Sequence, residues 1–197
     1  MKSGFFVFSL LLLIASCTKD RDVAPLLKSA AIVYPGIQYD SLDLFLPINH
    51  DLLKINEFVA RGSENVNEFG ETEDWFEIYN TTPYSLILKE GNWFVTDKGF
   101  EDPDRYQLPQ CTIPPFGFLL IWADGLDLVD QFIHTNFGLS ASGEHIGIYY
   151  SDDTLSIMID DYEYPFQEVP AVSTGRYLDG EDNWIQFNTP TPGMSNN

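Results

Sequence analysis

Short apolar runs, many of them alternating with polar residues, follow one another along the chain from residue 53 onward. Turn-forming residues separate these runs at intervals of about 8–12 positions, which is typical of an all-β protein. No long stretch has the 3.6-residue period of an amphipathic helix. We therefore expect strands at residues 53–59, 75–79, 85–88, 93–96, 106–108, 111–113, 116–122, 134–137, 145–150, 155–159, 172–177 and 184–187.

The same pattern indicates which side chains are buried. The run 75–79 carries bulky residues on both faces, which predicts a central strand that is buried on one side and partly covered on the other. The run 116–122 is continuously apolar, and we expect Phe118, Leu120 and Trp122, which alternate along it, to belong to the core. Many short strands without a long helix predict a β-sandwich or a β-barrel.

The first residues of the chain predict export. Lys2 precedes an apolar run over residues 5–14, and this run is shorter than the roughly 20 residues that cross a bilayer. It indicates a secretory signal peptide. The following Ile14-Ala15-Ser16-Cys17 resembles the lipobox of bacterial lipoproteins, in which the cysteine carries the lipid. An ordinary signal peptide with an incidental cysteine is the alternative.

Lipidation of Cys17 implies that the mature chain is held on a membrane by its acylated N-terminus. Thr18, rather than an aspartate, follows the cysteine, and this favours the outer membrane of a Gram-negative bacterium. Lys19 and the nearby acids resemble a surface-export signal, or they form a solvated tether, so periplasmic and outward-facing orientations both stay open. The expected organisation is a signal peptide at 1–16, a lipidated N-terminus and extended tether at 17–51, a β domain at 52–193 and a frayed tail at 194–197.

Several motifs occur in a characteristic order along the β domain. They include Ile55-Asn56-Glu57-Phe58, Trp75-Phe76-Glu77-Ile78, Ile113-Pro114-Pro115-Phe116-Gly117, His134-Thr135-Asn136-Phe137-Gly138 and Thr189-Pro190-Thr191-Pro192-Gly193. Together they resemble the bacterial branch of the lamin-tail domain family. The resemblance implies an immunoglobulin-like β-sandwich that serves as an accessory domain in secreted proteins, and it supplies no catalytic set.

Charge and cysteine content limit the classes of binding partner and of metal site. The chain has 10 Lys and Arg against 30 Asp and Glu, a formal net charge of −20. Such a surface repels phosphate backbones, so nucleic acid is not an expected partner, whereas cations and basic partners suit the charge. Two cysteines exclude a disulfide framework and a four-thiolate zinc site, and we expect Cys111 to be a buried thiol.

The candidate catalytic groups are expected to have structural roles. Ser140 and Ser142 precede His145, but no Gly-x-Ser-x-Gly motif is present, and hydroxyls on a turn more often satisfy backbone groups. His134 and His145 lie on different expected strands and form no zinc motif, so each is expected to have a satisfied ring nitrogen. We expect no catalytic site and no enzyme.

Acidic loops provide the single metal hypothesis, which is a calcium site. Glu71 and Asp74 lie in one loop, and Asp97, Asp102 and Asp104 lie in another. Calcium takes six to eight oxygen ligands, often from such loops, but the spacing fits no Asp-x-Asp-x-Asp-Gly loop. A solvated acidic surface without a cofactor is the favoured interpretation, and the calcium alternative stays open.

The expected function is that of a monomeric, lipid-anchored interaction module on the cell surface, which binds a protein or a matrix component. The fold resemblance alone supports this expectation. A glycan-binding or extracellular-DNA-binding accessory, with calcium assisting, is the alternative, and a small hydrolase is a third. Four tryptophans, Trp75, Trp93, Trp122 and Trp184, are candidates for a glycan platform, but they fall inside expected strands, where core positions are commoner.

Overall fold

The computed structural model describes residues 51–153 and 155–196, and these residues form almost exclusively β-structure. They contain thirteen strands and one 3-10 turn, η1 (Gly99–Glu101). The strands are β1 (Leu53–Val59), β2 (Trp75–Asn80), β3 (Leu86–Leu88), β4 (Trp93–Thr96), β5 (Tyr106–Gln107), β6 (Cys111–Ile113), β7 (Phe118–Trp122), β8 (Leu128–Val129), β9 (Ile133–His134), β10 (Glu144–Ser151), β11 (Ser156–Tyr164), β12 (Ser173–Arg176) and β13 (Trp184–Phe187). The predicted signal peptide, Cys17 and most of the tether lie outside the described residues.

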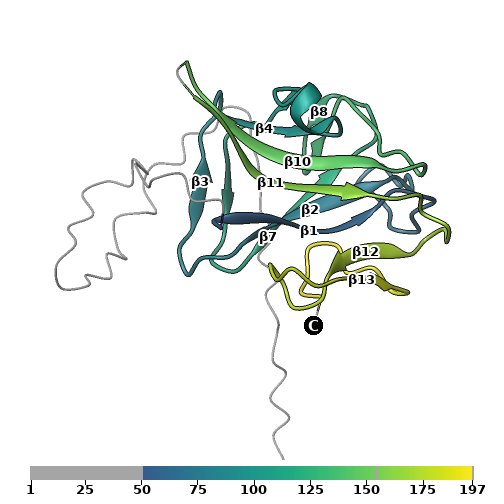
Figure 1. Cartoon of the computed structure of the whole chain (residues 1–197). Helices are drawn as coiled ribbons and strands as arrows, with labels where there is room; N and C mark the ends of the chain where they lie inside the picture. The colour runs from purple at the N-terminus through teal and green to yellow at the C-terminus, as the bar shows by residue number, and fades with distance from the viewer. Residues whose placement is uncertain (1–50, 154, 197) are drawn as a thin grey trace, which may run out of the picture.

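Two main sheets make up the domain. The larger has seven strands in the order β13-β12-β1-β2-β7-β9-β8, and the smaller has four in the order β11-β10-β4-β5. β3 and β6 form a separate two-stranded ladder at one end (Figure 1). Neighbouring strands run antiparallel except β7 and β9, which run parallel. β10 and β11 lie across β1, and the arrangement is consistent with the predicted β-sandwich.

Most of the expected strands are confirmed, with three clear differences. The strand expected at 134–137 is instead the two-residue β9, which shares only His134 with it. β8 has only two residues and no clear signal in the sequence. The strand expected at 155–159 is instead the nine-residue β11. Its second half looks too polar for a core strand, but Tyr162 and Tyr164 pack against Phe58 with ring centroids 6.0 and 4.5 Å apart. β11 therefore continues to Tyr164, because Tyr162 and Tyr164 face the core while Asp161 and Glu163 lie on the other face.

The apolar run of β7 has its core on the opposite face from the one predicted. Leu119 and Ile121 are 2% and 0% exposed and belong to the main core between the sheets. Leu120 is only partly buried, and with Trp122 it packs in a second cluster on the outer face of the large sheet. The prediction holds for Trp122, which is 2% exposed, but it is wrong for Phe118 and Leu120, which are only partly buried. Every residue of the run is apolar, so alternation alone does not choose the face. Cys111 is 3% exposed, which confirms the predicted buried thiol.

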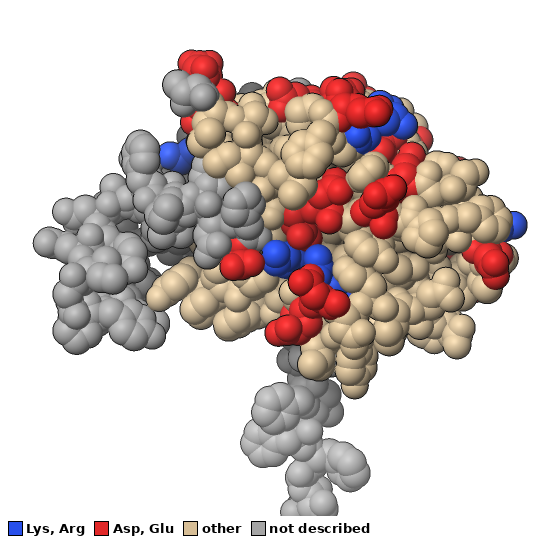
Figure 2. Space-filling model, in the orientation of Figure 1, with Lys and Arg blue, Asp and Glu red and all other residues tan. Residues whose placement is uncertain are grey.

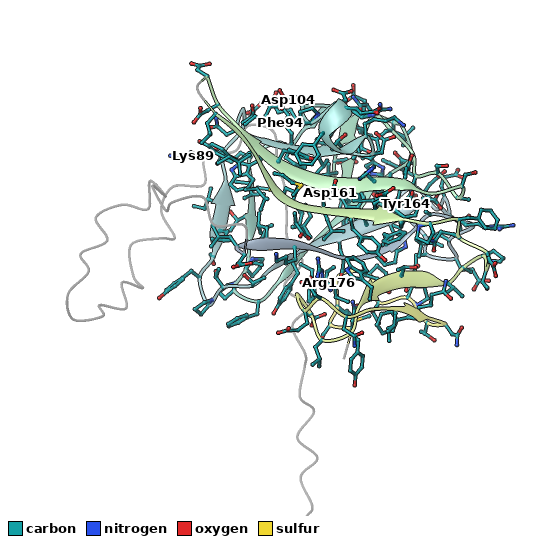
Figure 3. All side chains as sticks on the ribbon, in the orientation of Figure 1. Lys89, Phe94, Asp104, Asp161, Tyr164 and Arg176 are labelled. Carbon is teal, nitrogen blue, oxygen red and sulfur yellow. The ribbon has the colours of Figure 1, made fainter. Side chains whose placement is uncertain are left out.

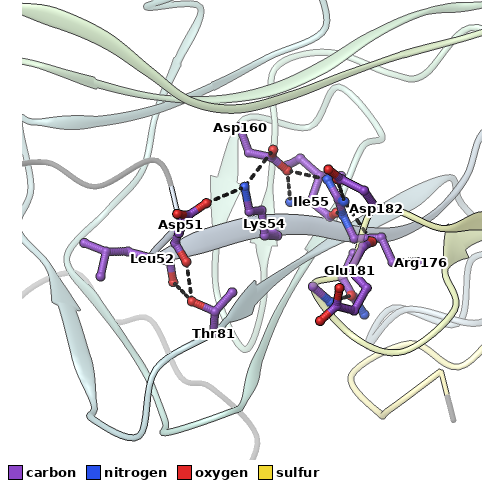
Figure 4. Close-up of polar contacts among 11 residues, drawn as sticks. Asp51, Leu52, Lys54, Ile55, Thr81, Asp160, Arg176, Glu181 and Asp182 are labelled. Atoms are coloured by element: carbon purple, nitrogen blue, oxygen red, sulfur yellow. Dashed lines mark hydrogen bonds and ion pairs between the residues drawn. The ribbon is translucent and has the colours of Figure 1, made fainter.

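Two charged side chains complete the hydrogen bonding of β1 beyond the end of β12. Asp160 of β11 accepts a hydrogen bond from the Ile55 N–H (2.8 Å), and the Arg176 Nε donates to the Ile55 carbonyl (2.8 Å). Arg176 Nη2 lies 3.1 Å from Asp160 Oδ2, so the pair is also an ion pair (Figure 4). Lys54 adds a second cation 3.7 Å from Asp160. These two side chains therefore give Ile55 the hydrogen bonds that a neighbouring strand would otherwise provide.

The C-terminal residues are held in place, so the expectation that 194–197 fray is wrong for the described part. Glu57 accepts hydrogen bonds from Ser173 and from the N–H and hydroxyl of Thr191, and Glu77 accepts one from the Gly193 N–H (2.8 Å). Asn196 is 6% exposed and donates to two backbone carbonyls. Burial raises the pKa of both glutamates above the ordinary range.

Candidate functional site

Two shallow hollows are the candidate binding sites on the described part of the chain. The first has a volume of about 290 Å³ and lies between η1 and the start of β10. It is lined by Asp97, Lys98, Phe100, Glu101, Glu144 and His145. The second has a volume of about 320 Å³ and lies between the end of β11 and the β12–β13 hairpin. Its lining is Tyr162, Pro165, Phe166, Gln167, Thr174, Trp184, Ile185 and Gln186, with no charged residue.

The first hollow, here called the His145 hollow, contains a histidine–aspartate pair. His145 Nδ1 lies 2.9 Å from Asp161 Oδ1, and Figure 3 shows Asp161 on β11 beside β10. Gly147 permits this approach, because a Cβ there would lie 2.9 Å from Asp161 Oδ2. Within the described residues, Asp161 Oδ2 and the buried Tyr149 hydroxyl have no hydrogen-bond partner. Burial, together with Asp161, raises the pKa of Tyr149 to about 12.

The structure brings no nucleophile to His145. The Ser140 hydroxyl accepts a hydrogen bond from the Ser142 N–H (3.2 Å), which confirms the predicted backbone role for that serine. The Ser140 N–H in turn donates to Glu144 (2.6 Å). A histidine with an orienting carboxylate activates a hydroxyl only if the hydroxyl lies within hydrogen-bond reach. The His145 hollow therefore shows half of a hydrolytic set among the described residues.

The five acidic residues proposed for calcium do not form one site. Asp97 is buried and pairs with Arg105 Nε (2.7 Å) and Lys98 Nζ (3.4 Å). Asp102 lies 4.0 Å from Arg105 Nη1, so this guanidinium occupies the space between the two carboxylates. Asp104 and Glu71 are exposed. Among the described residues, no group of three or more His, Cys, Asp and Glu side chains is placed to hold a metal ion.

Asp74 is the acidic loop residue with the most perturbed titration. Partial burial is the main cause, and the negative charges of Glu73 and Glu144 add to it, so that its pKa rises to about 7. The Glu144 carboxyl also has a raised pKa, mainly through burial, although hydrogen bonds from Ser140 and Tyr164 oppose the rise. Asp74 and Glu144, which lines the His145 hollow, repel each other when both are ionised, so their charge states depend on pH.

His134 is the second histidine with carboxylate neighbours, and it is fully buried. Its Nδ1 lies 2.5 Å from Asp124 Oδ2 and its Nε2 lies 3.1 Å from Glu68 Oε1, which confirms the predicted satisfied ring. Glu68 also accepts a hydrogen bond from the Phe132 N–H. Sequence reasoning missed both carboxylates, because Glu68 lies 66 positions away and no local pattern links it to the histidine. The cluster lies under Phe69 and has a structural role.

The tryptophans are core or covered residues, as predicted. Trp75 and Trp122 are 0% and 2% exposed. Trp93 is partly buried, and the Tyr150 ring meets it edge-on at 5.4 Å. Trp184 stacks on Tyr162 at a centroid distance of 3.6 Å, and the Arg176 guanidinium lies 4.6 Å from the same ring.

The second hollow, here called the β13 groove, differs from the first in having no charged residue in its lining. Phe166 is 55% exposed at one end, with Arg61 5.5 Å from its ring, and Ile185 is 39% exposed on β13. Figure 2 shows an extended tan area over β12 and β13, while red acidic atoms gather elsewhere on the same face and at its margin. This uncharged strip at the edge of a strongly acidic domain is therefore the candidate contact surface.

No family model matches the sequence, and no curated protein matches it. In the described residues, no helix has both the length and the apolar character required to cross a membrane. The β13 groove is the candidate site because it is a hollow of about 320 Å³ with no charged residue in its lining.

Proposed function

We propose that this protein is a non-catalytic interaction module, anchored by a lipid on Cys17 to the outer membrane and displayed toward a protein or matrix partner. The observation that carries the proposal is the β13 groove, an uncharged hollow of about 320 Å³ whose lining includes the exposed residues Phe166 and Ile185. The export and lipobox pattern at Ile14-Ala15-Ser16-Cys17 supports the membrane anchor.

We also propose that the domain is an immunoglobulin-like sandwich of the lamin-tail type. The support is that separate motifs of the resemblance contact one another. Glu57 from the first motif binds Thr191 from the last, and Glu77 from the second binds Gly193. Contacts across more than a hundred positions give these residues a shared structural reason to occur together.

The anchor is tested with the Cys17→Ala variant in the native host. Metabolic labelling with a palmitate analogue should label the original chain and not the variant, and the variant should remain uncleaved at that position. Equal labelling of the two chains would refute the lipid anchor. Added protease on intact cells then distinguishes an outward-facing domain, which is cleaved, from a periplasmic one, which is protected.

The interaction surface is tested by photo-crosslinking on cells that display the full chain. A photoreactive phenylalanine analogue replaces Phe166 in the groove or Phe116 on a distant loop, two phenylalanines that are 55% and 54% exposed. We expect specific adducts at position 166 and none at 116. Absence of adducts at 166, or equal adducts at both positions, refutes the β13 groove as the interaction surface.

A further inference from the structure

The β13 strand is an unprotected sheet edge. Within the described residues it pairs only with β12, and the sequence of the strand, Trp184-Ile185-Gln186-Phe187, has no charge and no proline. The edge strands β5 and β8 have two residues each, and the long edge strand β11 carries acidic side chains. Short strands, charges and prolines are the usual protections of an edge; β13, with four residues, is longer than β5 and β8 and carries neither a charge nor a proline.

The register identifies which backbone groups of β13 are available. The Tyr177 N–H donates to the Asn183 carbonyl (2.7 Å), so this pair is hydrogen-bonded. Antiparallel pairs alternate between bonded and non-bonded, and Arg176 lies opposite Trp184. Trp184 and Gln186 therefore direct their N–H and C=O groups to the open edge, whereas Ile185 and Phe187 direct theirs to β12.

The surroundings of the edge suit an extended chain with apolar side chains. Trp184 and Gln186 line the β13 groove together with Phe166, so alternate side chains of an added strand would enter an uncharged hollow. Ile185 lies between them on the strand, also lines the groove and is 39% exposed. The space-filling view shows tan, uncharged surface along this margin (Figure 2).

Charge decides the kind of occupant. Glu181 and Asp182 lie just before β13, separated from it by Asn183, and Glu168 follows groove residue Gln167; all three are exposed. Arg176 pairs with Asp182 and Arg61 lies over Phe166, so Glu181 and Glu168 are the acids that have no ion pair among these residues. The whole chain carries a net charge of −20, which opposes pairing of β13 with a second copy of itself. A segment with lysine or arginine next to its apolar residues is attracted instead.

We infer that β13 binds an extended, basic segment of another protein by strand addition, with backbone hydrogen bonds to Trp184 and Gln186 and apolar side chains in the β13 groove. This inference rests on the proposed function and specifies the partner of the same surface. Main-chain pairing supplies affinity, and the groove together with the acids beside it, Glu168, Glu181 and Asp182, supplies selectivity.

The test uses the full chain purified in detergent and an eight-residue probe peptide in which valine and lysine alternate. Gln186→Pro removes one outward N–H and leaves the β12 ladder intact, because proline is tolerated on the free side of an edge strand. Gln186→Ala is the matched control, since it shortens the same side chain and keeps the N–H. We expect at least a tenfold weaker binding for Gln186→Pro and less than a threefold change for Gln186→Ala.

Two further probes keep the inference testable even if Gln186→Pro disturbs the fold. A copy of the peptide N-methylated at alternate residues, and a copy with glutamate in place of lysine, should each bind the original chain at least tenfold more weakly. The amides of Trp184 and Gln186 should exchange with solvent more slowly when the basic peptide is bound. Equal binding of all three peptides, unchanged exchange, or a dimer of the chain in sedimentation would overturn strand addition.

Failure of this inference is distinguishable from failure of the proposed function. If crosslinking at position 166 persists undiminished in the Gln186→Pro chain, the groove binds its partner without strand addition, and only the inference is wrong. If no adduct forms at position 166 in the original chain, the interaction surface itself is wrong.

Discussion

Adjacent leucines of β7 face opposite sides of the large sheet, so the same substitution at each measures where the core lies. Leu119 is 2% exposed within the main core, and Leu120 is partly buried against the cluster of Val59, Trp75 and Trp122. We expect Leu119→Ala to destabilise the protein substantially more than Leu120→Ala. The two variants have identical chemistry and neighbouring positions, so differences in strand propensity cancel.

The magnitudes follow from burial. Replacing leucine by alanine removes three carbon groups, and at about 0.8 kcal/mol each the lost transfer free energy is about 2.4 kcal/mol. At Leu119 the sheets on both sides prevent collapse, so a cavity adds to this and the total is about 3–4 kcal/mol. At Leu120 part of the side chain already contacts water and the vacated space opens to solvent, which leaves about 1–2 kcal/mol.

Urea unfolding followed by far-ultraviolet circular dichroism measures both losses, provided that the slope of free energy against urea is the same in the three proteins. The reasoning is refuted if the two variants lose equal free energy or if Leu120→Ala loses more. A larger loss at Leu120 would place the core of β7 on the face of Phe118, Leu120 and Trp122, and equal losses would mean that the two faces are buried alike.

Three other predictions follow from the buried charges and the acidic loops. Asp160→Asn should lower the free energy of unfolding by about 3–5 kcal/mol, because it leaves Arg176 buried beside a neutral amide. Asp182, whose side chain is 95% exposed, also pairs with Arg176, and Asp182→Asn should lower it by less than about 1 kcal/mol. Equal losses in urea unfolding would contradict the role given to the Asp160–Arg176 pair. Asp74 has a folded-state pKa of about 7, raised from its ordinary value, so the folded state binds more protons; stability should therefore rise as the pH falls from about 7 toward 4, and Asp74→Asn should remove part of that rise in thermal melts. An unchanged pH profile in that variant would show that other carboxylates dominate. Millimolar calcium and magnesium should shift the melting temperature equally through screening, and a saturable shift with calcium alone would reveal a calcium site.

Much of the fold follows from local pattern. The runs at β1, β4, β6 and β13 alternate or are compactly apolar and are bounded by turn residues, so their limits agree with the structure. The all-β class follows in the same way, because strand spacing is a property of nearest neighbours in the sequence. Net charge, the export pattern and the buried thiol also need no tertiary information.

The candidate site was less predictable. Trp184, Gln186 and Phe166 carry no chemical motif, and only the fold places the end of β11 beside β13 to form a groove. The acids chosen for calcium were prominent in the sequence, yet Asp97 and Asp102 share the guanidinium of Arg105. Arg105 is close in sequence, but whether a carboxylate pairs with arginine or with a metal depends on side-chain directions that spacing does not define.

The sequence by itself determined the strand positions, the acidic surface and the predicted route to the membrane, because these depend on composition and on periodicity over a few residues. The tertiary structure alone decided which face of β7 is core, which carboxylates hold the C-terminal loop and His134, and which strand is left at an open edge. Each of these depends on pairing between residues far apart in the chain, where a shift of one position reverses every side chain. No local pattern encodes that choice, and only the packed sheets resolve it.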